Sequence, residues 1–323
     1  MTPGGSGPGP GTGAQPAPTP ARRPALGALM VVGAAALWDS LGLFGRLAFD
    51  HGAAPLEVGS VRAALAFLGI LPLALLRPAR LRLHTAHLPL VLGYGAIGVG
   101  FFYYVYLVAV ERLPLAVAAA LLYTAPAFVL ALSWALRWEP VRIRRLVPLT
   151  LTLAGAFLVT GAFRVLTRGP ADGGLAAGGL ATGQLAAGGI AAGVVSGVAY
   201  ALYTVLGKRI REHYDVFTTI FYAYGVGALV LAVVAPPWRV LADYPDAAPI
   251  LLLMGLGPTL LAALLFYGGI RHIDASAASM LATIEPVVAA LIGLAWLGEG
   301  LAWTTAVGTA LIVAAAAMLR PRR

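Results

Sequence analysis

Apolar residues form long runs along this chain, separated by short polar or charged stretches. Ten runs can be marked off, each about the length that a helix needs to cross a bilayer core of roughly 30 Å. The pattern therefore predicts an all-α integral membrane protein with ten transmembrane helices. We expect them over residues 26–48, 56–76, 88–110, 114–136, 146–163, 184–206, 216–236, 248–270, 275–298 and 302–319.

Two stretches fall outside this pattern and divide the chain. Residues 1–24 are rich in Pro and Gly and nearly uncharged, which is typical of a disordered tail. Residues 164–183 are rich in Gly and Ala and predict a flexible linker. The expected organisation is therefore a tail, a first five-helix repeat over 25–163, the linker, and a second five-helix repeat over 184–320.

The two halves resemble each other in sequence. A shift of 160 residues places AVERLPLAVAAALLYTAPAFV (109–129) on GIRHIDASAASMLATIEPVVA (269–289), so that Pro126 coincides with Pro286. A shift of 162 aligns LWDSLGLFGRL (37–47) with AYALYTVLGKR (199–209). Five helices per half is an odd number, so the second half must insert upside down. The sequence thus predicts two inverted five-helix repeats, with a site between them at the bilayer midplane.

Composition and charge fix the class and the orientation. The chain is 60% hydrophobic, only 11% charged and free of cysteine, which excludes an ordinary soluble domain and thiolate chemistry. The net charge of +9 is assigned to loops facing the cytoplasm and not to nucleic-acid binding. With the N-terminus inside, the inner side collects Arg22, Arg23, Arg77, Arg80, Arg82, Arg137, Arg142, Arg144, Arg145, Lys208, Arg209, Arg211, Arg271, Arg320, Arg322 and Arg323. The outer side collects only Arg46, Arg112, Arg164, Arg168 and Arg239, so both termini are predicted to be cytoplasmic.

Three charged side chains fall well inside predicted spans: Asp39, Arg62 and Glu285. Charges at this depth are costly, so each needs a partner, water or a function. Asp39 and Arg62 lie at similar depths on the first two helices, and one hypothesis is that they form an ion pair. The alternative is that Arg62 extends toward the outer interface while Asp39 faces water in a cavity.

Glu285 lies near the middle of its predicted span, immediately before Pro286. One interpretation is that it binds a cationic substrate group or carries the coupling proton. The other is that it is a protonated or hydrogen-bonded clamp at the proline kink. Pro126 has the same position in the first half, whereas Glu285 is aligned with Ala125. The kink is thus common to both halves, and the carboxylate is the feature that distinguishes the second.

Aromatic and hydroxyl side chains at mid-span are the other candidates for a binding site. By helical spacing, Val99, Phe102, Tyr103 and Tyr106 are expected to share one face. Gly257-Pro258 and Thr259 are expected to free backbone carbonyls at depth, where irregular backbone lines a cavity. The predicted substrate-binding set is Trp38, Asp39, Phe102, Tyr103, Tyr106, Tyr123, Tyr200, Tyr203, Thr259, Thr283 and Glu285, with Arg62 as a coupling or structural charge. The five histidines match no metal motif, and no metal or other cofactor is predicted.

Several of these features together resemble the drug/metabolite transporter superfamily in its EamA-type branch. They are Trp38 in the first helix, Arg62 in the second, Pro126 in the fourth, and Glu285-Pro286 and Glu299 in the ninth. The resemblance covers about residues 26–320 and implies a multi-pass carrier of the bacterial inner membrane. It also implies a central cavity lined by helices one, three, four, six, eight and nine. Asp39-Ser40 departs from the small or amide side chains that are more usual after the tryptophan.

The function expected from these observations is secondary transport of small metabolites by alternating access. An acid beside aromatic residues favours an amine-bearing solute such as an amino acid, in the export direction; efflux of cationic drugs is the alternative. No GxxxxGK[ST] loop or HExxH helix is present, which disfavours ATP hydrolysis and zinc proteolysis in this chain. An intramembrane enzyme or a channel remains a less favoured class. Expected partners are the solute, protons and membrane lipids, with the protein as a monomer or homodimer.

Overall fold

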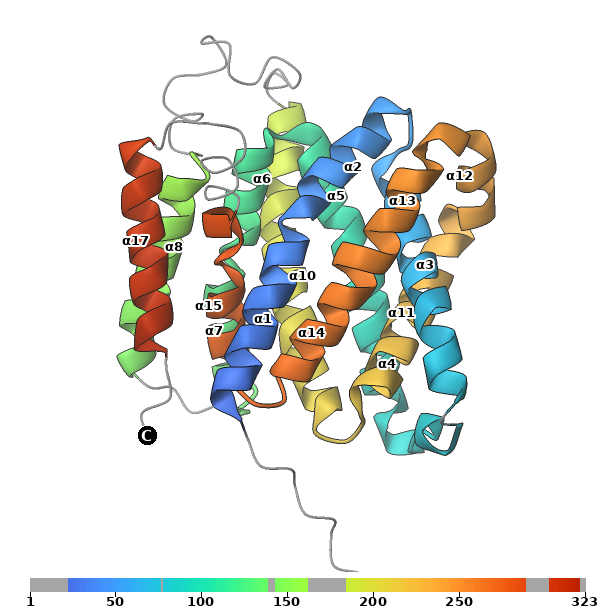
Figure 1. Cartoon of the computed structure of the whole chain (residues 1–323), viewed down its shortest axis with the longest axis horizontal. Coiled ribbons are helices and arrows are strands. Elements are labelled where there is room, and N and C mark those ends of the chain that lie inside the picture. Colours follow the sequence, from blue (N-terminus) through green and yellow to red (C-terminus); the bar gives the residue numbers. More distant parts are fainter. Residues whose placement is uncertain (1–22, 77, 139–142, 162–183, 289–301, 320–323) are drawn as a thin grey trace, which may run out of the picture.

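The computed structural model describes residues 23–76, 78–138, 143–161, 184–288 and 302–319, in which the regular structure is helical. A helix satisfies its backbone polar groups internally, which is what an apolar bilayer requires. Figure 1 shows the helices side by side as one bundle, with α8 and α17 together at one flank and α12 at the other.

The first half follows the predicted apolar runs. Its first two spans are α1 (Pro24–Trp38), continued by α2 (Ser40–Asp50), and α3 (Pro55–Leu75). The third run comprises α4 (Leu88–Gly93), the π-helical stretch η3 (Tyr94–Phe101) and α5 (Phe102–Arg112). The fourth comprises α6 (Leu115–Leu122) and α7 (Ala125–Ala135), and the fifth is α8 (Leu146–Val159).

The second half repeats this order. It contains α10 (Gln184–Arg211), α11 (Val216–Val234) and the short connecting helix α12 (Pro237–Asp243). Then follow α13 (Ala248–Met254), the π-helical stretch η7 (Gly255–Leu261), α14 (Ala262–Gly269), α15 (Ala275–Ala282) and α17 (Trp303–Met318). Within the described ranges, seven helices are long and apolar enough to span a membrane, and two more are shorter and apolar. The count of ten spans stays a prediction, and residues 289–301 of the ninth run lie outside the described residues.

Interruptions of the helices recur at the predicted spacing of 160 residues. The third run of each half contains a π-helical stretch, at Tyr94–Phe101 and at Gly255–Leu261. The fourth run of each half is broken just before its proline, after Leu122 and after Ala282. Such departures from α-helical hydrogen bonding are rare, so their recurrence supports the internal duplication inferred from sequence.

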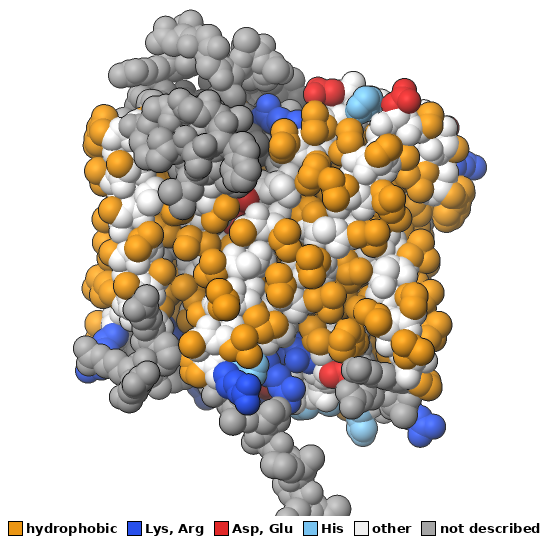
Figure 2. Space-filling model, viewed as in Figure 1, with side chains coloured by type: hydrophobic (Ala, Val, Ile, Leu, Met, Phe, Trp, Pro, Cys, Tyr) orange, Lys and Arg blue, Asp and Glu red, His pale blue; other side chains and the backbone are white. Residues whose placement is uncertain are grey.

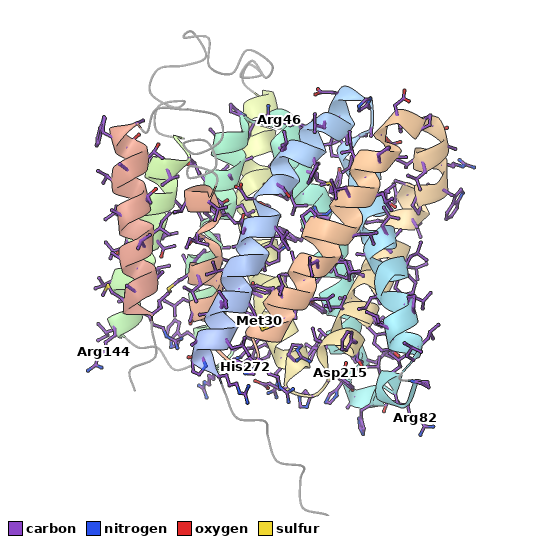
Figure 3. All side chains as sticks on the ribbon, viewed as in Figure 1. Met30, Arg46, Arg82, Arg144, Asp215 and His272 are labelled. Atoms are coloured by element: carbon purple, nitrogen blue, oxygen red, sulfur yellow. The ribbon has the colours of Figure 1, made fainter. Side chains whose placement is uncertain are left out.

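The first helices of the two halves run in opposite directions. The backbone N–H of Arg23, where α1 begins, donates to Nδ1 of His272 at 3.4 Å. Lys208, near the end of α10, donates from Nζ to the carbonyl of Ile270 at 2.8 Å. The start of α1 and the end of α10 therefore lie at the same end of the bundle, as an inverted arrangement requires (Figure 3).

The two ends of the bundle differ in charge. Figure 2 shows a broad apolar band between them, with Lys and Arg gathered at the lower end. We call the lower end the arginine-rich end; its described basic residues are Arg23, Arg82, Arg137, Arg144, Arg145, Lys208, Arg209, Arg211 and Arg271. The opposite end carries Arg46, Arg112 and Arg239 among the described residues, together with several acids.

Side-chain contacts join the two halves at the arginine-rich end. Arg145, from the first half, pairs with Asp274 and donates to the hydroxyl of Ser276. Asp274 is also the N-cap residue of α15, a position that favours an acid.

A second contact joins loops of the two halves at the same end. The rings of His87 and His213 lie 4.4 Å apart between centroids, and Nδ1 of His87 is 2.9 Å from the hydroxyl of Tyr214. Partial burial, and then the charge of His87, lower the pKa of His213 from its usual 6.5. Packing of the two rings therefore disfavours the charged form of His213.

The helices α8 and α17 pack through two glycines. A Cβ added to Gly155 would meet the carbonyl oxygen of Gly308 at 2.7 Å, and one added to Gly308 would meet that of Gly155 at 2.6 Å. Small residues allow this close backbone approach, which supplies much of the attraction between helices in lipid. The contact ties the last helix of one half to the last helix of the other.

We expect Gly308→Ala to lower the midpoint of thermal unfolding in detergent. The new methyl group would meet the backbone carbonyl of Gly155, which can move only if α8 moves with it. Overpacking of this kind costs about 1–3 kcal/mol. Gly93→Ala is the matched control, since a Cβ there meets nothing within 4 Å and a helical Ala is favoured over Gly. A midpoint for Gly308→Ala at or above that of the wild type would show that the close approach is not rigid.

Candidate functional site

A cavity of about 460 Å³ lies between the two halves. Its wall is mainly aromatic with two charged groups, as is common in small-molecule sites. The lining residues are Trp38, Leu41, Arg62, Phe102, Tyr103, Tyr106, Leu122, Tyr200, Tyr203 and Glu285. We call this space the main cavity.

The aromatic wall is built from contacts between rings of different helices. Trp38 of α1 lies 6.0 Å from Tyr200 of α10 and 5.0 Å from Phe266 of α14, measured between ring centroids. Phe102 of α5 lies 5.6 Å from Tyr200 and 6.0 Å from Tyr203. Edge and tilted packing of this kind is favourable and holds the rings in place. The wall is therefore formed by ring contacts between the two repeats.

Arg62 is held by neutral groups. It is only 3% exposed, its Nε donates to Oγ1 of Thr259 at 2.9 Å, and its guanidinium carbon lies 3.8 Å from the centre of the Tyr103 ring. Among the described residues it forms no ion pair with Asp39, so the hypothesis of an Asp39–Arg62 pair is wrong in this structure. A cation over an aromatic face is stabilised without a counter-charge. Arg62 is also one of the residues that line the main cavity.

Asp39 lies in the break between α1 and α2. The hydroxyl of Ser40 donates to the carbonyl of Leu37 at 2.7 Å and so satisfies a backbone group that this break releases. Asp39 is partly buried and is not among the residues that line the main cavity, although its neighbour Trp38 is. It nevertheless lies within electrostatic range of Glu285, so the two acids share one region.

Glu285 follows the break after α15 and is 9% exposed. Its Oε2 accepts a hydrogen bond at 3.0 Å from the hydroxyl of Tyr123, which lies in the corresponding break of the first half. Glu285 also borders a second, smaller cavity of about 230 Å³. The residues that line it are Leu122, Tyr123, Ala125, Pro126, Tyr200, Ser279, Ala282, Thr283 and Glu285. We call this space the small cavity.

Thr259 supports the site from outside the main cavity. It lies in the π-helical stretch η7, and its hydroxyl donates to the carbonyl of Met254 at 2.7 Å while accepting from Arg62. The predicted release of a carbonyl near Pro258 therefore occurs, and one threonine hydroxyl serves both groups. Val99, by contrast, lies against Gly227 of α11 and does not line the main cavity with Phe102, Tyr103 and Tyr106.

The sequence-predicted residues thus fall into three groups. The main cavity brings together Trp38, Phe102, Tyr103, Tyr106, Tyr200, Tyr203, Arg62 and Glu285. Tyr123 and Thr283 line the small cavity, while Thr259 and Asp39 line neither. Among the described lining residues, the main cavity takes Arg62 from the second helix and none from the eighth, unlike the arrangement that the family resemblance implies.

Sequence reasoning did not assign six of the lining residues to a site: Leu41, Leu122, Ala125, Pro126, Ser279 and Ala282. Each lies in an ordinary apolar or small-residue context that carries no signal for a site. Within the described residues, no three His, Asp or Glu side chains gather as a metal-ligand set.

Comparisons with known proteins agree with this architecture. The EamA-like transporter family matches residues 25–161 and 187–320, one region in each half. An uncharacterized transporter of Archaeoglobus fulgidus is 30% identical over 291 residues, covering 89% of this chain and 94% of that protein. An uncharacterized transporter of Clostridium kluyveri is 28% identical over 123 residues, covering 37% of this chain and 40% of that protein. A protein of known crystal structure superposes with a TM-score of 0.68 at 19% identity, covering 92% of this chain and 98% of that one, which shows a shared fold.

We expect Thr259→Val to destabilise the protein, because it leaves both Nε of Arg62 and the carbonyl of Met254 without their hydroxyl partner. An unsatisfied buried polar group costs about 1–3 kcal/mol. Thr259→Ser keeps the hydroxyl and is the matched control. The thermal unfolding midpoint in detergent measures the effect; equal midpoints for the Val and Ser variants would contradict this role.

Proposed function

Because the chain belongs to the EamA-like transporter family, we propose that it is a secondary transporter that moves small metabolites across the membrane by alternating access. One observation carries the proposal. The carboxyl group of Glu285 is buried between two repeats, beside an aromatic cavity of about 460 Å³. A carboxyl group in the interior of a membrane protein is costly and marks a substrate or ion pathway. A site between repeats is where rocking of one half against the other exposes it to each side in turn.

The main cavity favours a solute that carries an amino group and an apolar part. Glu285 offers a carboxylate to an ammonium, and the guanidinium of Arg62 offers donors to a carboxylate. The aromatic wall between them suits an apolar side chain. An amino acid or a related compound combines these three features, so we propose this class as the substrate.

Efflux of amphipathic cations is the second candidate. It is favoured by the proximity of Asp39 and Glu285, since two acids in one region outweigh the single charge of Arg62. Removing the positive charge separates the candidates. Arg62→Gln should weaken transport of a zwitterion and spare, or even improve, transport of a cation. A counterflow screen in proteoliposomes with amino acids, nucleosides and cationic drugs supplies both kinds of solute.

The charge difference between the two ends supports an orientation. Basic loops stay in the cytoplasm during insertion, so the arginine-rich end is proposed to face inward in a bacterial inner membrane. Both termini are then cytoplasmic. The pairing of Arg145 with Asp274 joins the halves at this end, so in the proposed cycle this contact opens when the cavity faces the cytoplasm. We propose export as the net direction, as the family resemblance implies.

The orientation can be tested with single cysteines, because the chain has none of its own. Arg82→Cys and Asp246→Cys place a thiol at an exposed position of the arginine-rich end and of the opposite end. In intact cells, a membrane-impermeant maleimide should label Asp246→Cys and should reach Arg82→Cys only after the membrane is permeabilised. The reverse pattern would contradict the proposed orientation.

Glu285→Gln tests the transport site itself. The amide keeps the shape of the side chain but loses the charge, so we expect solute counterflow in proteoliposomes to fall by about tenfold or more, as for the loss of a charge-assisted hydrogen bond. The remaining transport should lose its dependence on pH. Glu111→Gln is the matched control, since Glu111 is largely exposed. Undiminished, pH-dependent counterflow by Glu285→Gln would refute the role.

A further inference from the structure

Positive charges gather where the start of α1 meets the loop between α14 and α15. Arg23 directly precedes α1, while Arg271 and His272 lie in that loop, at the lower end of α1 in Figure 3. Lys208 and Arg211 belong to the last turn of α10, which ends beside them. The backbone N–H of Arg23 donates to Nδ1 of His272 at 3.4 Å. We call Arg23, Arg271 and His272 the basic cluster.

Two glycines fix the position of the basic cluster. A Cβ added to Gly27 would meet Cβ of His272 at 2.7 Å, and one added to Gly269 would meet the carbonyl oxygen of Gly27 at 2.6 Å. The backbones of α1 and α14 are therefore in contact about one turn after Arg23 and two residues before Arg271. This close approach places a cation of the first half beside a cation and an imidazole of the second half.

The acids at this end of the bundle are engaged elsewhere. In the described part of the chain they are Glu212, Asp215 and Asp274. Their carboxylates bind, in that order, a neighbouring arginine, the first turn of α11 and a basic residue of the first half. Within the described residues, neither the Arg23 nor the Arg271 side chain forms an ion pair or a hydrogen bond. Both side chains are exposed, so their charges are accessible to a ligand.

The charges that act on His272 are all of one sign. Burial, and then nearby positive charges, lower the pKa of His272 from its usual 6.5. These charges belong to Arg271, Arg23, Arg211 and Lys208. Because Nδ1 of His272 accepts from the backbone, the neutral ring carries its proton on Nε2 and offers one further donor. The basic cluster thus presents positive charge and hydrogen-bond donors, which together suit an anion.

Exposed apolar side chains continue from the basic cluster into the apolar band. Leu26 and Leu29 of α1 are 42% and 69% exposed, and they lie about 5 and 9 Å beyond Arg23 along the helix. Figure 1 shows α1 and α14 side by side at the front of the bundle. On this face, Figure 2 shows the Lys and Arg side chains of the lower end directly below apolar side chains. A ligand bound here therefore meets positive charge at one end and an apolar surface at the other.

We propose that the basic cluster binds the phosphate of an anionic phospholipid whose acyl chains lie along Leu26 and Leu29. Guanidinium groups bind phosphate through charge-assisted hydrogen bonds, and basic pockets between transmembrane helices bind lipid head groups in this way. The bound phosphate links Arg23 of the first half to Arg271 and His272 of the second. None of these residues lines the main cavity, so the site does not depend on the identity of the solute.

Lipid binding can be measured on the purified full-length chain in detergent. The probes are phosphatidylglycerol and phosphatidylcholine with the same acyl chains, at constant ionic strength, and the readout is the thermal unfolding midpoint. We expect phosphatidylglycerol to raise the wild-type midpoint more than phosphatidylcholine does. Arg23→Gln and Arg271→Gln should each weaken the apparent affinity for phosphatidylglycerol by about fivefold, as for one basic residue at an anionic lipid surface. Their midpoints without lipid should stay close to that of the wild type, because neither side chain has a partner in the described residues.

Arg82→Gln is the matched control, since Arg82 is exposed at the same end but lies away from His272 (Figure 3), and its variant should keep the wild-type response. An equal effect of the two lipids on the wild type, or an equal loss of affinity in Arg82→Gln and Arg23→Gln, overturns the site. Inorganic phosphate is the third probe. If it raises the wild-type midpoint as much as phosphatidylglycerol does, the cluster binds a soluble anion and the lipid proposal is wrong. None of these measurements uses transport, so their failure leaves the proposed function standing.

Discussion

Every backbone polar group at membrane depth must find its partner inside the protein, and this requirement determines where the site can lie. The α-helix meets it for the backbone, since each amide is paired within its own segment. In the described part of the chain, the α-helical spans are interrupted by the breaks at Tyr123 and Thr283, the break at Asp39, and the stretches η3 and η7. Hydroxyl groups on Ser40, Thr259 and Thr283 satisfy carbonyls close to three of these irregular segments. Irregular backbone and the cavities thus occupy the same part of the bundle, where groups that lipid would leave unpaired are covered by protein.

Duplication places these exceptions opposite each other. The break of the first half contributes Tyr123 and that of the second half contributes Glu285, and the hydroxyl of one donates to the carboxylate of the other. The residue aligned with Glu285 is Ala125, which adds no charge. The two halves therefore share one backbone geometry at the break but carry different side chains there. The first half contributes the hydrogen-bond donor Tyr123, and the second contributes the acid Glu285. A carboxylate in both breaks would put two like charges at the same depth, which is costly in an apolar interior.

The sequence predicts well how deep a residue lies in the membrane. It predicts poorly the direction in which that residue's side chain points around the helix axis. Hydropathy located the helical segments, and the offset of 160 residues located the paired breaks at Pro126 and Pro286. The same depth argument suggested that Asp39 and Arg62 pair, but Arg62 points to Thr259 and Tyr103 instead. The depth of a residue can be obtained by counting residues along its helix. The direction of its side chain changes with every local departure from 3.6 residues per turn.

Val99 shows why such departures matter. Counting at 3.6 residues per turn places it on one face with Phe102, Tyr103 and Tyr106, yet it packs against Gly227. It lies within the π-helical stretch Tyr94–Phe101, whereas the three aromatic residues come after that stretch. One extra residue in a turn rotates the residues before it by about 100° relative to the residues after it. No residue type in this stretch signals the extra residue, so a site built across it becomes visible only in three dimensions.

Helix α15 connects the middle of the bundle to its arginine-rich end. Its first turn carries Ser276, which with Asp274 binds Arg145 of the other half, and its last turn leads into the break that presents Glu285. Glu285 lies eleven positions after Asp274, about 16 Å further along the segment, and the break at Thr283 separates it from α15. In the proposed cycle, the ligand held by Glu285 and the contact between Arg145 and Asp274 therefore act on the two ends of one short segment, which is how we propose that site and end communicate.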